Sequence, residues 1–360
     1  MLIVARGDTL ISLSTVDEKR PPHGNSCRGR LRLCRTTTRP RYPLPRPAGP
    51  LVNARDPHPP SLPATAPDQP AGCRPLLLDL LFPLPALAVG ALVMRASGVH
   101  ATAWGQNLVA CVIGILLCFA LARPRSSRRG EFGLLAAGVL ALGCLAATWL
   151  DPGVQDVHRW LRLGPVRLHA GALVLPVMLA TLAGLERAGR RHLSTLLSIA
   201  TALLLALQPD AAQATAFAAG AVVLLLPRKR ADGHAWIRLV PLLALAGLSW
   251  LRSDPLAPVP HVEGIVGLAL ELGTGWGAAA VGSLLLLPLP FFAARGQGEG
   301  RAALALGAYI VVTILAPAFA HFPVPVLGQG ASPIIGYFVA IGLLRRSQGS
   351  VPPAGTTLRG

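Results

Sequence analysis

Long apolar stretches recur through the chain from residue 73 to residue 346, and short polar connections separate them. A helix that crosses the hydrocarbon core of a bilayer needs about 17–25 mainly apolar residues. Ten stretches approach or reach that length: 76–94, 106–122, 132–150, 169–185, 193–208, 211–227, 236–251, 264–290, 303–319 and 331–345. Lipid permits only helices or closed barrels, and these stretches are too long for barrel strands. The pattern therefore predicts an all-α integral membrane domain at 73–346, folded as a bundle of ten spans.

Every second connection between the predicted spans is basic. The residues concerned are Arg123, Arg125, Arg128 and Arg129, then Arg187, Arg190 and Arg191, then Arg228, Lys229 and Arg230, then Arg295 and Arg301, and finally Arg345 and Arg346. This alternation is what the positive-inside bias produces when both termini lie in the cytoplasm. The connections left for the outer face are 95–105, 151–168, 209–210, 252–263 and 320–330.

One outer connection, 151–168, departs from this rule because it carries Arg159, Arg162 and Arg167. Two interpretations remain open at this point. The arginines form a functional cationic patch, or they and Trp160 only reach toward the membrane surface from an interfacial position.

Composition agrees with a membrane protein, since 52% of the 360 residues are hydrophobic, 14% are charged and the mean hydropathy is +0.53. A net charge of +17 would suggest nucleic acid as the partner of a soluble protein. Here most of the charge lies in the N-terminal tail and in the short connections, so we expect a membrane lipid partner and no nucleic acid.

The two ends of the chain look different from the membrane domain. Residues 1–72 are rich in Pro, Arg, Ser and Thr and have no periodic apolar face, which predicts a disordered, dispensable cytoplasmic tail. Two other interpretations of residues 1–72 are a nucleic-acid-binding arm and a start codon assigned too far upstream. Residues 347–360 are expected to form a cytoplasmic C-terminal tail. The six cysteines show no metal-ligand spacing, and we expect neither a disulfide nor a bound metal.

Unusual polar residues concentrate in four stretches that the topology assigns to the outer face: 156–171, 208–210, 253–273 and 322–344. Ionisable groups at membrane depth are costly and are functional candidates for that reason. We therefore expect the four stretches to meet in one cavity.

These stretches resemble the SEDS family (shape, elongation, division and sporulation), the FtsW/RodA/SpoVE proteins of bacterial cell-wall synthesis. Residues 159–164, Arg-Trp-Leu-Arg-Leu-Gly, resemble the family's R-W-I-x-L-G, and residues 207–210 reproduce its L-Q-P-D. Near the C-terminus the family's P-F-x-S-Y-G-G-S-S and G-L-L resemble Pro325, Gly330, Ser332 and residues 342–344.

The chain also departs from the family pattern at several positions. The family's Q-P-S-E-x-x-K is replaced by residues 169–172, His-Ala-Gly-Ala, followed by Leu175, and two C-terminal positions have become Gly328 and Gln329. The Gln208-Pro209-Asp210 segment predicts a tight outer turn by its own chemistry, because proline ends a helix and an aspartate at the start of the next helix favours its dipole. A catalytic role for Asp210 is the alternative.

The resemblance implies a ten-span fold and a glycosyltransferase that polymerises lipid II. In the family a loop reading P-E-x-H-T-D-F, followed by E-E-L-G, carries an essential aspartate. Here His261, Glu263 and residues 271–273, Glu-Leu-Gly, resemble that region but are one residue shorter. Glu263 takes the place of the aspartate if the helix absorbs a one-residue slip, and otherwise Val262 does.

An acid is needed in that reaction because the sugar 4-hydroxyl of lipid II must lose its proton as it attacks. The resemblance thus implies Glu263 as the catalytic base. The residues expected to bind substrate are Arg159, Trp160, Arg162, Arg167, His169, Asp210, His261, Gln329 and Ser332, with the arginines facing the lipid diphosphate.

The implied partners are lipid II, linked to undecaprenyl diphosphate, and a class B penicillin-binding protein, and the implied location is the bacterial inner membrane. No cofactor is expected, and the question of a divalent cation beside the lipid diphosphate stays open. The alternatives are an inactive homologue that binds the lipid-linked precursor or a partner, and a multi-pass lipid or small-molecule transporter.

Overall fold

The computed structural model of the protein describes residues 75–123, 127–164, 166–226, 235–252, 254–296 and 300–348. All of them belong to one compact unit, Gln69–Gly360. The predicted N-terminal tail and the chain beyond residue 348 lie outside the described residues, as do residues 124–126, 227–234 and 297–299 in three of the basic connections.

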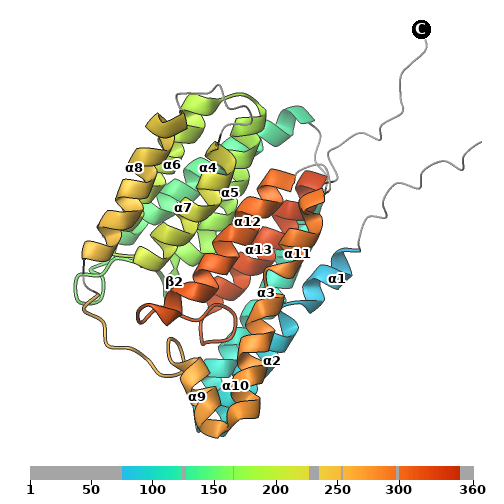
Figure 1. Ribbon diagram of the computed structural model, residues 1–360, viewed down its shortest axis with the longest axis vertical. Helices are drawn as coiled ribbons and strands as arrows, with labels where there is room; N and C mark the ends of the chain where they lie inside the picture. The colour runs from blue at the N-terminus through green and yellow to red at the C-terminus, as the bar shows by residue number, and fades with distance from the viewer. Residues whose placement is uncertain are drawn as a thin grey trace, which may run out of the picture. The chain divides into compact units, whose positions relative to one another are not determined.

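The described chain is mostly helical (Figure 1). The helices of its first part are α1 (Leu76–Leu81), α2 (Leu84–Ala96), α3 (Ala101–Ala122), α4 (Ser127–Ala147), α5 (Ala170–Arg187), α6 (Arg191–Leu207) and α7 (Ala211–Leu225). Those of its second part are α8 (Ala235–Leu248), α9 (Ile265–Leu272), α10 (Thr274–Leu286), α11 (Leu289–Ala293), α12 (Gly300–Leu315) and α13 (Ala331–Gln348). Single 3-10 turns extend four of them, at η1 (Thr148–Leu150), η2 (Ser249–Leu251), η3 (Ala294–Gly296) and η4 (Ala316–Ala318).

Helix occupies each of the ten predicted segments. By length and composition, six helical segments among the described residues are long and apolar enough to cross a membrane: Leu76–Ala96, Ala101–Ala122, Gly133–Leu150, Ala170–Arg187, Thr274–Gly296 and Gly300–Ala318. Three shorter helices, Arg191–Leu207, Ala211–Leu225 and Trp236–Leu251, are also apolar. The chain is a multi-pass membrane protein.

The all-α expectation is wrong in one place, because the connection after α4 contains a two-stranded antiparallel hairpin. Strand β1 (Trp160–Leu163) pairs with β2 (Val166–His169), and Trp160 lies opposite His169. Leu161, Leu163, Val166 and Leu168 fall on one face of the hairpin, and Trp160, Arg162, Arg167 and His169 fall on the other. Gly164 allows the tight turn because its φ of 60° is readily adopted by glycine.

The eighth predicted segment, 264–290, is not one continuous helix. Residues 265–272 form α9, which turns back and packs against α10 (Figure 1). The turn is at Gly273, whose φ of 136° and ψ of 158° belong to a region that only glycine adopts readily. This turn sets the direction in which the preceding loop, 254–264, approaches the bundle.

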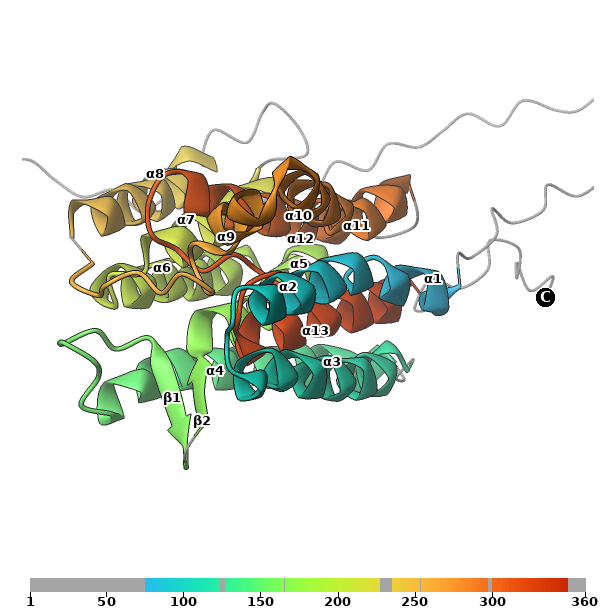
Figure 2. The same cartoon turned by 90° about the horizontal axis from the view of Figure 1, so that it is seen from below.

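Helix α13 lies in the interior and packs against α3 and α5 (Figure 2). Close approach depends on glycine, because a Cβ on Gly336 would lie 2.0 Å from the carbonyl oxygen of Ala172 in α5. Small residues at such contacts are typical of helix packing in membranes. The start of α13 is thereby held beside the start of α5.

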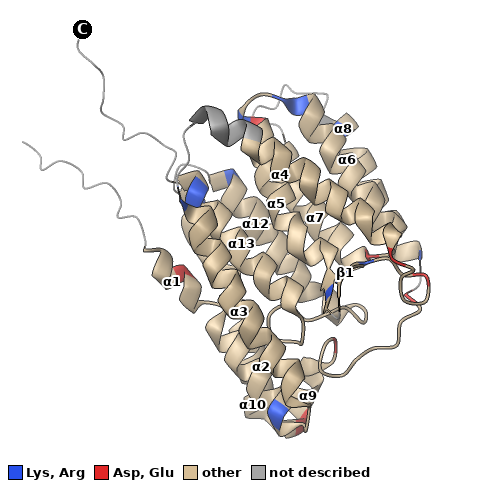
Figure 3. Ribbon diagram, turned by 180° about the vertical axis from the view of Figure 1, so that it is seen from behind, with Lys and Arg blue, Asp and Glu red and all other residues tan. Residues whose placement is uncertain are grey.

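Lys, Arg, Asp and Glu residues lie mainly toward the two ends of the helices (Figure 3). At the end where α13 and α5 terminate, Arg345 forms a buried ion pair with Asp79. At the same end Arg301 donates to the carbonyl groups of Val223, Leu224 and Leu226 at the end of α7. The opposite end carries the four polar stretches.

Candidate functional site

A cavity of about 850 Å³ opens at the end of the helices where the four polar stretches meet. Eight of the ten residues predicted to form the site line it: Arg159, Trp160, Arg167, His169, Asp210, Glu263, Gln329 and Ser332. Two predicted site residues, Arg162 and His261, are not in its lining. Arg162 forms an ion pair with Asp151, 3.0 Å away, and its side chain is 45% exposed.

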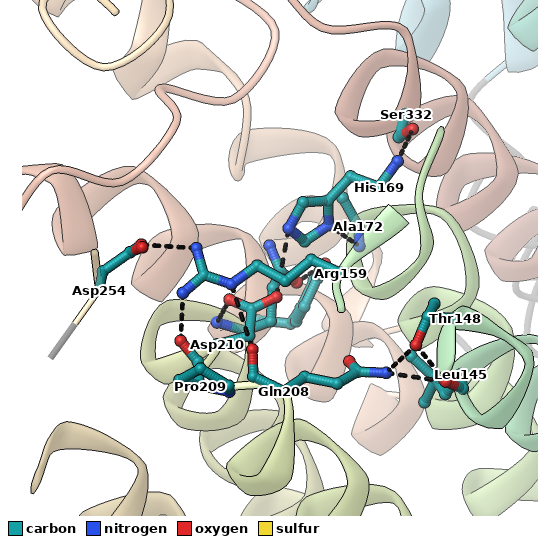
Figure 4. A network of polar contacts seen from close by, with 12 residues as sticks. Leu145, Thr148, Arg159, His169, Ala172, Gln208, Pro209, Asp210, Asp254 and Ser332 are labelled. Carbon is teal, nitrogen blue, oxygen red and sulfur yellow. Dashed lines mark hydrogen bonds and ion pairs between the residues drawn. The ribbon is translucent and has the colours of Figure 1, made fainter. Parts of the chain in front are cut away.

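Arg159, just ahead of β1, is 5% exposed and connects three segments (Figure 4). Its guanidinium donates to a carboxylate oxygen of Asp254 at 2.6 Å and to the carbonyl oxygens of Gln208 and Pro209. A planar guanidinium suits such a fork of acceptors. Arg159 therefore holds the hairpin, the α6–α7 turn and the loop after η2 together.

Gln208 and Asp210 complete the turn between α6 and α7 (Figure 4). The Gln208 side-chain amide donates to the carbonyl oxygen of Leu145 and to the hydroxyl of Thr148, both at 2.7 Å. Asp210 is the N-cap of α7 and accepts from the Gln213 backbone N–H at 3.3 Å. The turn predicted from these residues is present.

His169 connects Asp210 to the start of α5. Its Nδ1 accepts the backbone N–H of Ala172 at 3.2 Å. Its Nε2 lies 3.2 Å from a carboxylate oxygen of Asp210. The backbone N–H of His169 in turn donates to the Ser332 hydroxyl at 2.8 Å, which ties β2 to the start of α13.

The charge on Asp210 is stabilised by this environment. Burial by itself raises the pKa of the Asp210 carboxyl, but the nearby His169 and Arg159 and the hydrogen bond from Gln213 outweigh it, and the pKa lies below its ordinary value. Asp210 is 2% exposed and stays ionised.

Three carboxylates line the cavity, and they differ in their partners. Asp254 is paired with Arg159, and Asp210 is paired with His169. Among the described residues Glu263 forms no ion pair and accepts a hydrogen bond from the Val259 backbone N–H at 2.7 Å. Glu263 does not cap α9, whose N-cap is Gly264 with no side-chain hydrogen bond.

The loop that carries Glu263 is paired with the 324–330 loop. Val324 N–H donates to the Val262 carbonyl at 3.1 Å, and Gln329 N–H donates to the His261 carbonyl at 2.9 Å. A Cβ on Gly328 would lie 2.5 Å from the Val262 carbonyl oxygen, so glycine is required for this approach. The His261 carbonyl thus helps to hold the two loops together, while Val262 and Glu263 both line the cavity.

Asn107 of α3 fixes the 324–330 loop from the other side. Its side-chain amide donates to the Gly328 carbonyl and accepts from the Gly330 N–H, both at 3.0 Å, and the residue is 2% exposed. Sequence reasoning missed Asn107, although a lone amide within an apolar span is a visible signal.

Other residues of the cavity were also missed. Asp254 lies in a stretch that was singled out, but its role depends on Arg159, 95 positions earlier. Tyr309 of α12 donates to the side-chain carbonyl of Gln213 at 2.7 Å, and both line the cavity, as do Gln106 and His321. Contacts between such distant positions have no local sequence signal.

Within the described residues no group of three or more His, Cys, Asp or Glu side chains is arranged to hold a metal ion. Cys111, Cys118 and Cys144 have free thiols, and Cys27, Cys34 and Cys73 lie outside the described residues.

Comparison with known proteins identifies the fold. The model of the FTSW_RODA_SPOVE family, described as "Cell cycle protein", matches residues 73–253. No curated protein matches the chain. The structure of rod shape determining protein RodA from Thermus thermophilus is similar with a TM-score of 0.57 and 20% identity, covering 75% of this chain and 96% of that one.

Two further solved structures resemble the chain. A mutant of the same Thermus thermophilus RodA gives a TM-score of 0.58 and 19% identity, covering 75% of this chain and 97% of that one. A structure on the coordination of polymerization and crosslinking by a peptidoglycan synthase complex gives a TM-score of 0.52 and 22% identity, covering 76% of this chain and 97% of that one. At these identities the similarity concerns the fold.

Proposed function

The chain belongs to the FtsW/RodA/SpoVE family of cell cycle proteins, and from this premise we propose that it polymerises lipid II as a peptidoglycan glycosyltransferase in bacterial cell-wall synthesis. In this proposal it crosses the bacterial inner membrane ten times with both termini in the cytoplasm, so that the cavity faces outward. A class B penicillin-binding protein is the proposed partner, in keeping with the similarity to part of a peptidoglycan synthase complex.

The observation that carries the proposal is the state of Glu263. A general base needs a carboxylate that can accept a proton, and pairing with a cation lowers the basicity of a carboxylate. The Arg159 guanidinium is paired with Asp254 and also helps to lower the pKa of Asp210, whereas Glu263 lines the same cavity without a cationic partner among the described residues. Glu263 is therefore the proposed base.

In the proposed step the 4-hydroxyl oxygen of lipid II forms a bond to the anomeric carbon of the growing strand. Its proton passes to the Glu263 carboxylate. The bond from the anomeric carbon to undecaprenyl diphosphate breaks, and the diphosphate leaves with the electron pair. Accumulating negative charge on the leaving group favours a nearby cation.

Arg167 is the proposed contact for the diphosphate. It is exposed, lines the cavity and forms no ion pair with any described residue. Arg159 has the Asp254 carboxylate and two carbonyl groups as acceptors, and Arg162 is paired with Asp151 outside the lining. These two arginines are better suited to holding the site than to binding substrate.

Polymerisation of labelled lipid II by the purified protein, alone and with a class B penicillin-binding protein, tests the proposal. Glu263→Gln preserves the size of the side chain and its acceptor for the Val259 N–H but cannot take up the proton. We expect it to slow polymerisation by about 10²–10⁴-fold. Glu271→Gln is the matched control, because Glu271 is exposed on α9 and outside the cavity lining.

Retention of most activity by Glu263→Gln would exclude Glu263 as the base. A wild-type protein that binds lipid II but never polymerises it, with or without its partner, would instead identify the chain as an inactive homologue. The replacement of the family's Glu and Lys by the buried Ala172 and Leu175 makes this second outcome worth measuring directly.

A further inference from the structure

The β1–β2 hairpin lies across the direction of the helices. Its strands are seen nearly end-on in Figure 1 and at full length in Figure 2, where the turn of the hairpin extends past α3 and α4. These two helices expose apolar side chains such as Leu116, 65% exposed, and Leu140, 69% exposed. Lipid therefore borders the bundle on the side toward which the hairpin points.

The tip of the hairpin is apolar and uncovered. Leu163 is 63% exposed and Val166 is 43% exposed, and the two are direct partners across the strands. Neither position is required by the turn itself, which depends on Gly164. An exposed apolar pair at the end of a projecting hairpin indicates a contact outside the chain.

Tryptophans mark the level at which the hairpin lies. Trp149 lies in η1 after α4, Trp250 lies in η2 after α8, and Trp160 begins β1, all at the cavity end of the bundle. Tryptophan is enriched where lipid headgroups meet the hydrocarbon core. The hairpin thus begins at the level of the outer headgroups and runs along that level.

The charges on the hairpin fit the same surroundings. Arg162 and Arg167 are direct cross-strand partners, and like charges placed opposite one another repel. Asp151 neutralises one of them, which leaves a net positive charge beside the apolar tip. Lipid phosphates provide the complementary anions, and arginine side chains extend readily toward them from an apolar anchor.

From these observations we infer that the hairpin tip is an anchor in the outer leaflet, with Leu163 and Val166 embedded at the headgroup boundary beside the net positive charge of the Arg162–Arg167 pair. The anchor holds one wall of the cavity against the lipid surface, since Leu163, Val166 and Leu168 also line the cavity. The choice of the outer leaflet rests on the topology in the proposed function, whereas contact of the tip with lipid does not depend on the proposed catalytic activity.

Site-directed fluorescence tests the anchor. A variant with its six native cysteines replaced by alanine would carry Leu163→Cys or Val166→Cys, labelled with an environment-sensitive NBD group. It would be reconstituted in nanodiscs of phosphatidylcholine and phosphatidylglycerol. The matched control is Gln155→Cys, an exposed polar position in the same connection. Nitroxide-labelled lipids report contact with the membrane, and iodide reports contact with water.

We expect the label at 163 or 166 to emit at shorter wavelength, to be quenched by nitroxide lipids and to lose quenching by iodide, while the label at 155 behaves in the opposite way. Iodide quenching at 163 and 166 equal to that at 155 would overturn the anchor. Protection of both positions from lipid and iodide alike would also overturn it, because the tip would then be covered by protein.

Discussion

At the scale of single residues, the cavity is built from side chains whose hydrogen bonds reach across the sequence. Asn107 is hydrogen-bonded to Gly328 and Gly330, which lie more than 200 positions later in the sequence. Arg159 is hydrogen-bonded to Asp254, which lies 95 positions later. Buried polar groups of this kind contribute mainly because leaving either partner unsatisfied is costly. Two variants measure this directly.

Asn107→Leu keeps the side-chain size but removes both bonds to the 328–330 backbone. We expect a loss of about 1–3 kcal/mol in the free energy of unfolding and faster hydrogen exchange at 324–330 and 259–263, measured by mass spectrometry. Ser283→Ala is the control, because buried Ser283 bonds only to Ala280 in its own helix. Equal exchange in the 324–330 loop of both variants would contradict the role of Asn107.

Asp210→Asn retains an acceptor for the Gln213 N–H but removes the charge facing His169 and Arg159. Because the pKa of the Asp210 carboxyl is lowered in the folded protein, the ionised carboxylate stabilises the fold. This stabilisation is complete above about pH 3.9, the ordinary aspartate pKa. The effect is lost as the pH falls through the lowered native value.

In thermal unfolding the Asp210→Asn variant should therefore be less stable than the wild type at neutral pH. The difference should shrink as the solution is acidified through that window. Asp156→Asn, which removes an exposed carboxylate from the 151–158 turn, is the control for the change of net charge. A difference between Asp210→Asn and the wild type that is constant with pH would contradict the assignment.

At the scale of elements, the chain reverses direction at two glycines, and the lengths of the apolar segments do not predict these reversals. The eighth apolar segment is long enough for a single span, but Gly273 turns it back into α9 and α10. Gly164 likewise lies in the turn that folds the strands Trp160–Leu163 and Val166–His169 into a hairpin. The hairpin lines the cavity, and α9 follows shortly after the lining residues Val262 and Glu263. Apolar length does not report where the chain reverses.

Gly273→Ala tests the turn between α9 and α10. No atom lies within 4 Å of the added Cβ, so its cost is conformational and about 1–3 kcal/mol. Gly275→Ala is the matched control, since it also meets open space but lies in helix α10, where alanine is favoured over glycine by about 0.5–1 kcal/mol. Thermal unfolding should move in opposite directions for the two variants, and a shift in the same direction would exclude strain at Gly273.

At the scale of the whole molecule, the arrangement of the ends relative to the membrane remains a prediction from charge. Thiols introduced at Ala257 and Gln329, in a background without native cysteines, should react with an impermeant reagent added from outside. A thiol at Lys229 should react only after the membrane is opened. The reverse pattern would contradict the ten-span topology with both termini inside.

Sequence alone determined that the chain is a membrane protein, which segments are helical and that the four polar stretches belong together. These follow from local properties, because apolar length and the position of charge are set by neighbouring residues and by the cost of placing polar groups in lipid. Family membership followed from short motifs such as residues 159–164 and 207–210.

Only the tertiary structure decided which of these residues face one another. Asp254 pairs with Arg159 and Asp210 with His169, whereas Glu263 forms no ion pair with a described residue. Arg162 pairs with Asp151 outside the cavity lining, and Asn107 is hydrogen-bonded to the loop that contacts His261. A carboxylate has the same chemistry wherever it occurs in a sequence, and its basicity depends on the charges and donors that packing brings within a few ångströms. Those neighbours come from distant segments, so helix packing and the two glycine turns determine them.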